Sequence, residues 1–182
     1  MTTIQVNDSI CLSMPEREDA AELFKVVDSN REYLRVWLPW VDNMQSVANF
    51  EEYIISSKQQ AAEKTDYGFS IMINDKIAGR IGMHKINRHN KIGEIGYWLA
   101  EGMQGQGIIT RSCKTLIQFG FYSLGLNRIE IKCGTGNHKS KAIAEKLKFK
   151  QEGILRQAEW LNGKFIDLYL FAMLKEGWES IL

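Results

Sequence analysis

The sequence predicts a mixed α/β fold: a mostly antiparallel sheet with one central parallel βαβ crossover and flanking helices. Two patterns predict it. Apolar residues recur at helical spacing over most of 15–64, whereas 67–100 alternates in segments joined by short turns. A glycine-containing loop at 101–107 then connects a strand to an amphipathic helix and a further strand. Such a unit pairs its two strands in parallel.

The N-terminal half is predicted to hold a short strand, over 9–14, and several helices. Helical spacing places them over 15–30, 31–40 and 47–64. Pro15 suits the first helical position because the backbone N–H that it lacks would be unpaired there in any case. Pro39 ends or interrupts the second helix.

The C-terminal half begins with an antiparallel meander. Its predicted strands cover 67–74, 76–88 and 91–100. The elements that follow are a helix over 108–124, a strand over 127–133 and a helix over 138–149. Asn162-Gly163 is a strong hairpin signal, so 150–161 and 164–174 are expected to pair.

Length, net charge, apolar runs and cysteine content limit the classes of protein to which this chain can belong. The chain has 182 residues, enough for one domain with a real core, and we expect 1–182 to be a single domain. A net charge of +1 gives no bulk attraction to nucleic acid or membranes. No apolar run approaches the ~20 residues of a membrane span. Three separated cysteines and no secretory signal indicate reduced thiols in the cytoplasm, and no cysteine or histidine spacing indicates a metal.

The segment EGMQGQGIITRS, residues 101–112, is the most informative stretch. Bare backbone N–H groups at a helix start form an anion site, although a glycine-rich loop can also be an ordinary turn. No Gly-Lys-Ser/Thr follows it, so it is not a P-loop. Thr110 occupies the third glycine position of a dinucleotide fingerprint, which excludes that motif.

This loop and its surroundings resemble the GCN5-related N-acetyltransferase (GNAT) superfamily. Gln104-x-x-Gly107-x-Ile109 is similar to the family signature Gln/Arg-x-x-Gly-x-Gly/Ala and departs from it at Ile109. Further segments resemble the RimJ/RimL branch, which acetylates ribosomal-protein N-termini: 34–40, 93–108, 131–149, 152–153 and 157–167. The resemblance implies a GNAT fold and acetyl transfer from acetyl-coenzyme A (acetyl-CoA) to a primary amine.

The resemblance also assigns the cofactor contacts. The pyrophosphate is expected on the loop and helix start, formed by Gln104, Gly105, Gln106, Gly107, Ile108, Ile109 and Thr110. The pantetheine arm is expected along the strand residues Tyr97, Trp98 and Leu99. Asn137 is expected to bond that arm, or else to be only a turn residue after Gly136.

Two catalytic residues follow from the resemblance. Glu159 is the expected base for the attacking amine, with Glu94 as the alternative. An α-amino group has a pKa of about 7.7–8.0, so a carboxylate suffices. Ser140 matches the position facing the leaving sulfur, although a structural role in its helix is an alternative. A backbone N–H near Tyr97 would stabilise the oxyanion. A covalent role for Cys133 is not expected.

The sequence is compatible with more than one class of acetyl acceptor. The RimJ/RimL resemblance favours a ribosomal-protein N-terminus, held in a groove beside residues 33–40 that Arg31 and Arg35 would contact. A polyamine or aminoglycoside is the alternative, and an acidic groove of Asp42, Glu51 and Glu52 would suit it. A CoA-binding regulatory module without catalysis is a third reading. We expect no membrane or direct nucleic-acid partner, and a homodimer is compatible with the sequence.

Overall fold

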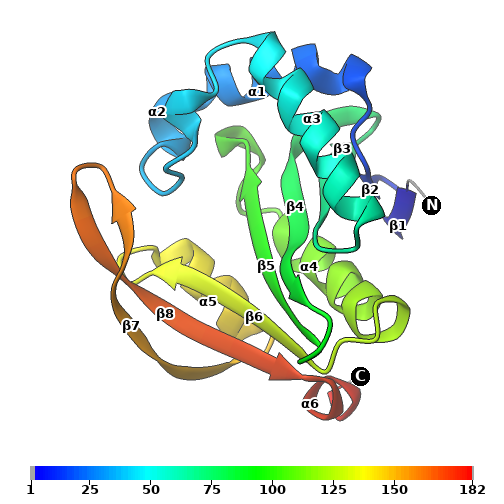
Figure 1. Ribbon diagram of the computed structural model, residues 1–182, viewed down its shortest axis with the longest axis vertical. Coiled ribbons are helices and arrows are strands. Elements are labelled where there is room, and N and C mark those ends of the chain that lie inside the picture. Colours follow the sequence, from blue (N-terminus) through cyan, green and yellow to red (C-terminus); the bar gives the residue numbers. More distant parts are fainter. Residues whose placement is uncertain (1–2, 182) are drawn as a thin grey trace.

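One eight-stranded sheet organises the computed structural model, which describes residues 3–181 (Figure 1). Its order is β1-β2-β3-β4-β5-β6-β8-β7, and only β5 and β6 pair in parallel. The strands are β1 (Thr3–Asn7), β2 (Ile10–Ser13), β3 (Tyr67–Ile73), β4 (Lys76–Asn87), β5 (Ile92–Leu99), β6 (Arg128–Gly134), β7 (Lys150–Leu161) and β8 (Lys164–Leu174). The predicted mixed α/β class, meander and central crossover are confirmed.

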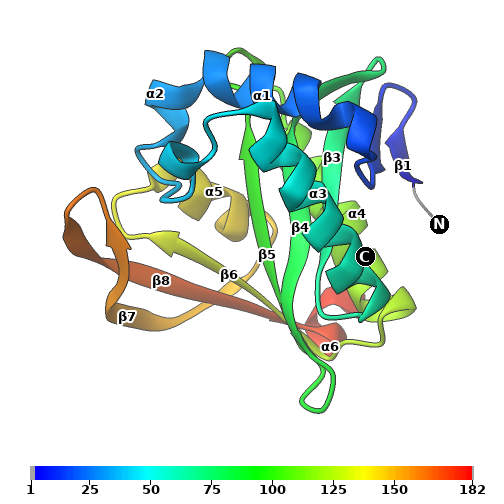
Figure 2. The ribbon, with the colours of Figure 1, turned by 45° about the horizontal axis from the view of Figure 1, so that its top comes forward.

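Helices cover both faces of this sheet (Figure 2). They are α1 (Ala20–Ser29), α2 (Arg31–Leu34), α3 (Val47–Ala62), α4 (Ile108–Gln118), α5 (His138–Lys146) and α6 (Lys175–Glu179). α1 and α3 pack on β4 and β3, whereas α4 packs on the opposite face. Each face therefore has its own apolar core, one centred on Leu23, Phe50 and Ile54, the other on Cys113, Leu116 and Phe121.

Several boundaries differ from the prediction. β1 was not predicted, and its side chains alternate between exposed and half-buried because it lies at the sheet edge. The second helix stops at Leu34 instead of reaching residue 40, although the Leu38 N–H still bonds the Leu34 carbonyl at 3.0 Å. Pro39 then prevents helical backbone from continuing, because it disfavours the helical conformation at Leu38. The helix predicted over 108–124 ends in a π turn, Phe119–Ser123, where the Leu124 N–H bonds the Phe119 carbonyl.

The parting of β5 and β6 positions the site. Their parallel pairing covers only Ile92–Glu94 against Arg128–Glu130. Beyond it, β5 stays with β4 as far as Leu99, while β6 stays with β8 as far as Gly134. A wedge therefore opens between the two central strands at their carboxyl ends, where ligands bind in open α/β sheets.

Within residues 3–181, no helix has the length and apolar content that crossing a membrane requires. That 1–182 is a single domain stays a prediction.

Candidate active site

A cleft of about 510 Å³ occupies the wedge between β5 and β6. One wall is the chain after α2, where Trp37, Leu38, Pro39 and Trp40 line it, and the other is the β7–β8 hairpin. Leu34, one turn earlier, is buried in the core. The Trp37 ring lies against the end of β6, since a Cβ on Gly134 would approach it to 3.0 Å. The segment 33–40 therefore both packs into the core and lines the groove.

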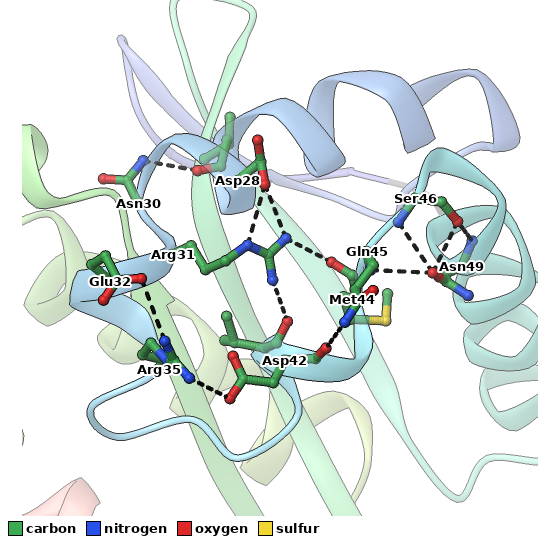
Figure 3. A network of polar contacts seen from close by, with 12 residues as sticks. Asp28, Asn30, Arg31, Glu32, Arg35, Asp42, Met44, Gln45, Ser46 and Asn49 are labelled. Atoms are coloured by element: carbon green, nitrogen blue, oxygen red, sulfur yellow. Dashed lines mark hydrogen bonds and ion pairs between the residues drawn. The ribbon is translucent and has the colours of Figure 1, made fainter. Parts of the chain in front are cut away.

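A polar network fixes that wall (Figure 3). Arg31 donates to the Asp28 carboxylate at 3.1 Å and to the carbonyl oxygens of Val41 and Met44 at 2.6 and 2.8 Å. Arg35 pairs with Asp42 at 3.0 Å. Of the two arginines expected to contact the peptide, Arg31 has its guanidinium engaged within the chain, whereas Arg35 has a 43% exposed side chain and keeps N–H donors free. The hairpin tip joins the wall, because Asn162 Nδ2 donates to the Arg35 carbonyl at 3.1 Å.

A bulge in β7 presents Glu159 to the cleft. Leu155 pairs with Leu168 and Glu159 with Ile166, so four steps along β7 match two along β8. Asp167 Oδ1 accepts the Gln157 N–H at 2.8 Å and holds the bulge. Bulges of this kind redirect side chains beside functional sites. Burial raises the pKa of the Glu159 carboxyl; Glu94 acts in the same direction and Lys85 opposes it.

Glu94 lies in the same cleft in a different electrostatic state. Its carboxylate accepts from Lys132 at 2.8 Å and Lys85 at 3.3 Å. Burial alone would raise the pKa of Glu94, but the two lysines outweigh burial and lower it. Glu94 is therefore held ionised and is a weak base, whereas the raised pKa of Glu159 makes its carboxylate the better proton acceptor.

Ser140 and Tyr97 meet across the wedge. The Ser140 hydroxyl lies 2.9 Å from the Tyr97 hydroxyl, which also donates to the Ser140 carbonyl at 3.3 Å. Asn137 caps α5, because its Oδ1 accepts the Ser140 N–H at 3.1 Å, and it also lines the cleft. Burial raises the pKa of the Tyr97 phenol and of the Cys133 thiol, so both are protonated at neutral pH.

The glycine loop leads into α4. Gly105 and Gly107 have φ of +75° and +70°, in the left-handed region, and Gly107 is the N-cap of α4. Gln104 Oε1 accepts from Lys139 at 2.7 Å, whereas its buried Nε2 has no partner among the described residues. The free backbone N–H groups at the start of this 11-residue helix form its positive end. The loop thus suits a pyrophosphate.

The other predicted cofactor residues differ in where their side chains lie. Ile108 and Ile109 are buried in the core, as is Leu99, so any ligand contact from them comes through the backbone. Trp98 packs on the opposite face, with its ring centroid 6.2 Å from that of Trp40. Of the strand residues, Tyr97 is the one whose side chain reaches the Ser140 hydroxyl.

A second cavity, of about 440 Å³, adjoins the cleft under α3 and was not predicted from the sequence. Arg80 and His84 line it from β4. His84 Nδ1 lies 2.8 Å from Asp66, and its ring covers Gly82 and Gly96. Alternation along β4 puts Arg80, Gly82 and His84 on one face, but only the packing of α3 reveals that this face is enclosed. Among the described residues, no three His, Cys, Asp or Glu side chains gather as a metal site needs.

Comparison with known proteins identifies the family. The acetyltransferase (GNAT) domain family matches residues 9–150. The chain is 34% identical over 181 residues to a putative ribosomal N-acetyltransferase, YdaF, of Bacillus subtilis, covering 99% of each chain. It is 33% identical over 172 residues to the ribosomal-protein-serine acetyltransferase of Escherichia coli, covering 94% of this chain and 96% of the relative.

A solved structure has the same architecture. RimL, a ribosomal L7/L12 α-N-protein acetyltransferase in complex with coenzyme A, superimposes with a TM-score of 0.92 at 27% identity, covering 96% of this chain and 99% of RimL. The fold, the glycine loop at a helix start and the family match agree. The chain belongs to the GNAT family of acetyltransferases, in its RimJ/RimL branch, and is an acetyl-CoA-dependent N-acetyltransferase.

Proposed function

We propose that this enzyme acetylates the N-terminal α-amine of a protein, and that the protein is ribosomal. The observation that carries the proposal is the cleft chemistry: a carboxylate with raised pKa, Glu159, shares the cleft with Ser140 and Tyr97. The names of the YdaF and ribosomal-protein-serine relatives support the ribosomal acceptor.

Acetyl-CoA supplies the acetyl group as an activated thioester. The backbone N–H groups of residues 104–110 would hold its pyrophosphate, helped by the positive end of α4. Residues 97–99 of β5 have no pairing with β6, so their backbone edge is available to hydrogen-bond the pantetheine arm. The Asn137 amide would bond the same arm while its oxygen caps α5.

Glu159 is the base in this proposal, acting directly or through a water. A terminal α-amine has a pKa of about 7.7–8.0, so a weak base with a raised pKa suffices to take its proton. Glu94 is the poorer base because Lys132 and Lys85 occupy its oxygens. We assign Glu94 the role of fixing these lysines beside the acceptor.

Ser140 and Tyr97 serve the leaving thiolate. Because the Tyr97 phenol is protonated, it can donate to Ser140, and the Ser140 hydroxyl can donate in turn toward the sulfur. The unpaired edge of β5 near Tyr97 offers a backbone N–H for the carbonyl oxygen as negative charge develops. Cys133 takes no covalent part, since burial raises the pKa of its thiol and buried thiols are inert.

The cleft charges favour a peptide over a polyamine. Lys85 and Lys132 line it beside the two glutamates, so the cleft lacks the excess of negative charge that would attract a polycation. Of the three acids considered for an acidic groove, Glu51 pairs with Arg17 at 2.7 Å and Asp42 with Arg35. The third, Glu52, is exposed on α3 and lines neither cavity. The presence of a suitable base also argues against a purely regulatory CoA-binding module.

A thiol-release assay tests the proposal. Purified enzyme with acetyl-CoA would be offered Ser- and Ala-starting ribosomal N-terminal peptides, spermidine and an aminoglycoside, after titration calorimetry has measured acetyl-CoA binding. We expect release with peptides alone. Release with spermidine or the drug would overturn the acceptor, and binding without release from any amine would favour the regulatory module. We also propose a cytoplasmic location, while homodimerisation stays a prediction.

A further inference from the structure

The second cavity adjoins the cleft. Leu38, Trp40, Gly96 and Tyr97 line both, so the second cavity lies within reach of a peptide held in the cleft. Apart from Arg80 and His84, its lining is mainly apolar and aromatic, including Met44, Phe50, Tyr53 and Trp98. A cavity of this composition would bury the apolar part of a ligand and leave one polar end to be matched.

Arg80 is a buried cation at this cavity. It lies on the central strand β4, opposite Ser70 on one side and Trp98 on the other, and is 6% exposed. Neither Nη1 nor Nη2 has a hydrogen-bond partner among the described residues. The Tyr53 ring, 4.7 Å from the guanidinium carbon, is a neighbour of its charge, but a ring cannot accept five N–H bonds.

Glycines make room for this arrangement. Gly68, Gly82 and Gly96 are in register across β3, β4 and β5. A Cβ on Gly68 would come within 2.6 Å of Arg80 Nη2, and one on Gly82 within 2.5 Å of the His84 ring. The sheet therefore lets both side chains lie flat on its surface, where they line the cavity instead of filling it.

An unpaired buried guanidinium is costly unless an anion matches it, and a carboxylate matches it with two parallel hydrogen bonds. We propose that this cavity is an acceptor subsite, and that a carboxylate carried by the acceptor peptide pairs there with Arg80. The inference rests on the proposed function, because it names which peptides the enzyme prefers. It gives Arg80 a role in recognising an acidic residue that Arg31 cannot take while it holds the cleft wall.

The position of Arg80 limits where the acid can lie. Arg80 pairs with Trp98, two residues along β5 from Gly96, where the two cavities meet. At about 3.3 Å per residue this is a separation of about 7 Å, or roughly two residues of extended peptide. The acid is therefore expected within the first three residues of the acceptor.

The test uses matched peptides that begin with Ser and carry either Glu or Gln at position two or three. The readouts are kcat/KM from thiol release and Kd by calorimetry on enzyme saturated with coenzyme A. For wild type we expect the Glu peptide to be favoured about 10-fold or more at one position, the scale of a charge-assisted hydrogen bond. Arg80→Met should bring the ratio to about 1, and Arg80→Lys should keep part of it.

Exposed Arg88, at the end of the same β hairpin, gives the matched control, and Arg88→Met should keep the wild-type ratio. Thermal unfolding checks each variant, and if Arg80→Met does not fold, the wild-type ratio and Arg80→Lys decide. Release with equal kcat/KM and Kd for Glu and Gln at both positions would overturn this inference and leave the proposed function intact. Release from no peptide would overturn the proposed function, and the Kd ratio alone would then judge the subsite.

Discussion

Replacing Gly107 with alanine tests whether the loop backbone holds acetyl-CoA. Gly107 has φ +70° at the N-cap of α4, and an alanine there costs about 1–2 kcal/mol if it keeps that conformation. The added Cβ would lie 3.1 Å from Arg111 Nη1, the flexible end of a side chain that can move away. Backbone strain is therefore the main effect.

That strain must appear in one of two measurements. If the loop keeps its shape, the free energy of unfolding falls by about 1–2 kcal/mol. If the loop of the free variant relaxes to another conformation, acetyl-CoA binding must restore the positive φ at a cost of about 1–2 kcal/mol. The Kd for acetyl-CoA then rises about 5- to 30-fold. Calorimetry and chemical denaturation measure the two quantities, and Gly107→Val should affect both more strongly because a β-branched residue is less tolerant of positive φ.

The neighbouring glycines give graded controls. Gly105 has φ +75° with no atom within 4 Å of an added Cβ, so Gly105→Ala should show strain alone. Gly102 has neither a positive φ nor a neighbour within that distance, so Gly102→Ala should change nothing. Unchanged stability and unchanged Kd in Gly107→Ala would refute the reasoning, because the strain of a positive φ must appear in one of the two. A loss of stability with a Kd that does not change in any glycine variant, Gly107→Val included, would mean that the loop is only a turn.

Three further predictions concern the cleft acids and the bulge. Glu159→Gln should lower kcat about 100-fold near neutral pH and leave the Kd for acetyl-CoA unchanged. The ratio of wild-type to variant kcat should shrink as pH falls through the raised pKa of Glu159, because the wild-type base is then itself protonated. A ratio that does not vary with pH would remove Glu159 from the role of base. Asp167→Ala should loosen the β7 bulge and lower kcat about 10-fold, while kcat should still fall at low pH as Glu159 is protonated. An unaltered kcat in a folded variant would deny Asp167 a positioning role. Glu94→Gln should cost about 1 kcal/mol of stability at pH 7. Because the lysines lower the folded pKa of Glu94, this stability is present above its ordinary value of 4.5 and is lost as pH falls through the lowered pKa, so urea unfolding at low pH should find the two proteins alike.

The strands and turns were predictable where local chemistry determines them. Asn162-Gly163 sets the hairpin, and the predicted strands 150–161 and 164–174 match β7 and β8. β1 was missed although Ile4 and Val6 alternate, because a five-residue edge strand with half-buried side chains gives a weak pattern. The π turn at the end of α4 depends on packing, since a Cβ on Gly120 would lie 2.8 Å from Met83.

The site was predictable only in part. Residue patterns and family resemblance pointed to the glycine loop, Ser140 and Glu159, and the last two line one cleft. The bulge that aims Glu159 depends on Asp167 across the hairpin, a pairing that sequence spacing does not reveal. Arg80 was not predicted as functional, because arginine on a strand is ordinarily exposed and its burial requires α3 to cover β4.

The most direct test of the account is where the acetyl group goes. A peptide that starts with Ser and contains one internal Lys would be incubated with the enzyme and acetyl-CoA at pH 7 and sequenced by tandem mass spectrometry. A lysine pKa of about 10.4 leaves far less free base than an α-amine, and Glu159 is too weak a base to compensate. The account predicts acetylation of the α-amine alone. Acetyl groups on the lysine, or none on the α-amine of any peptide offered, would contradict it.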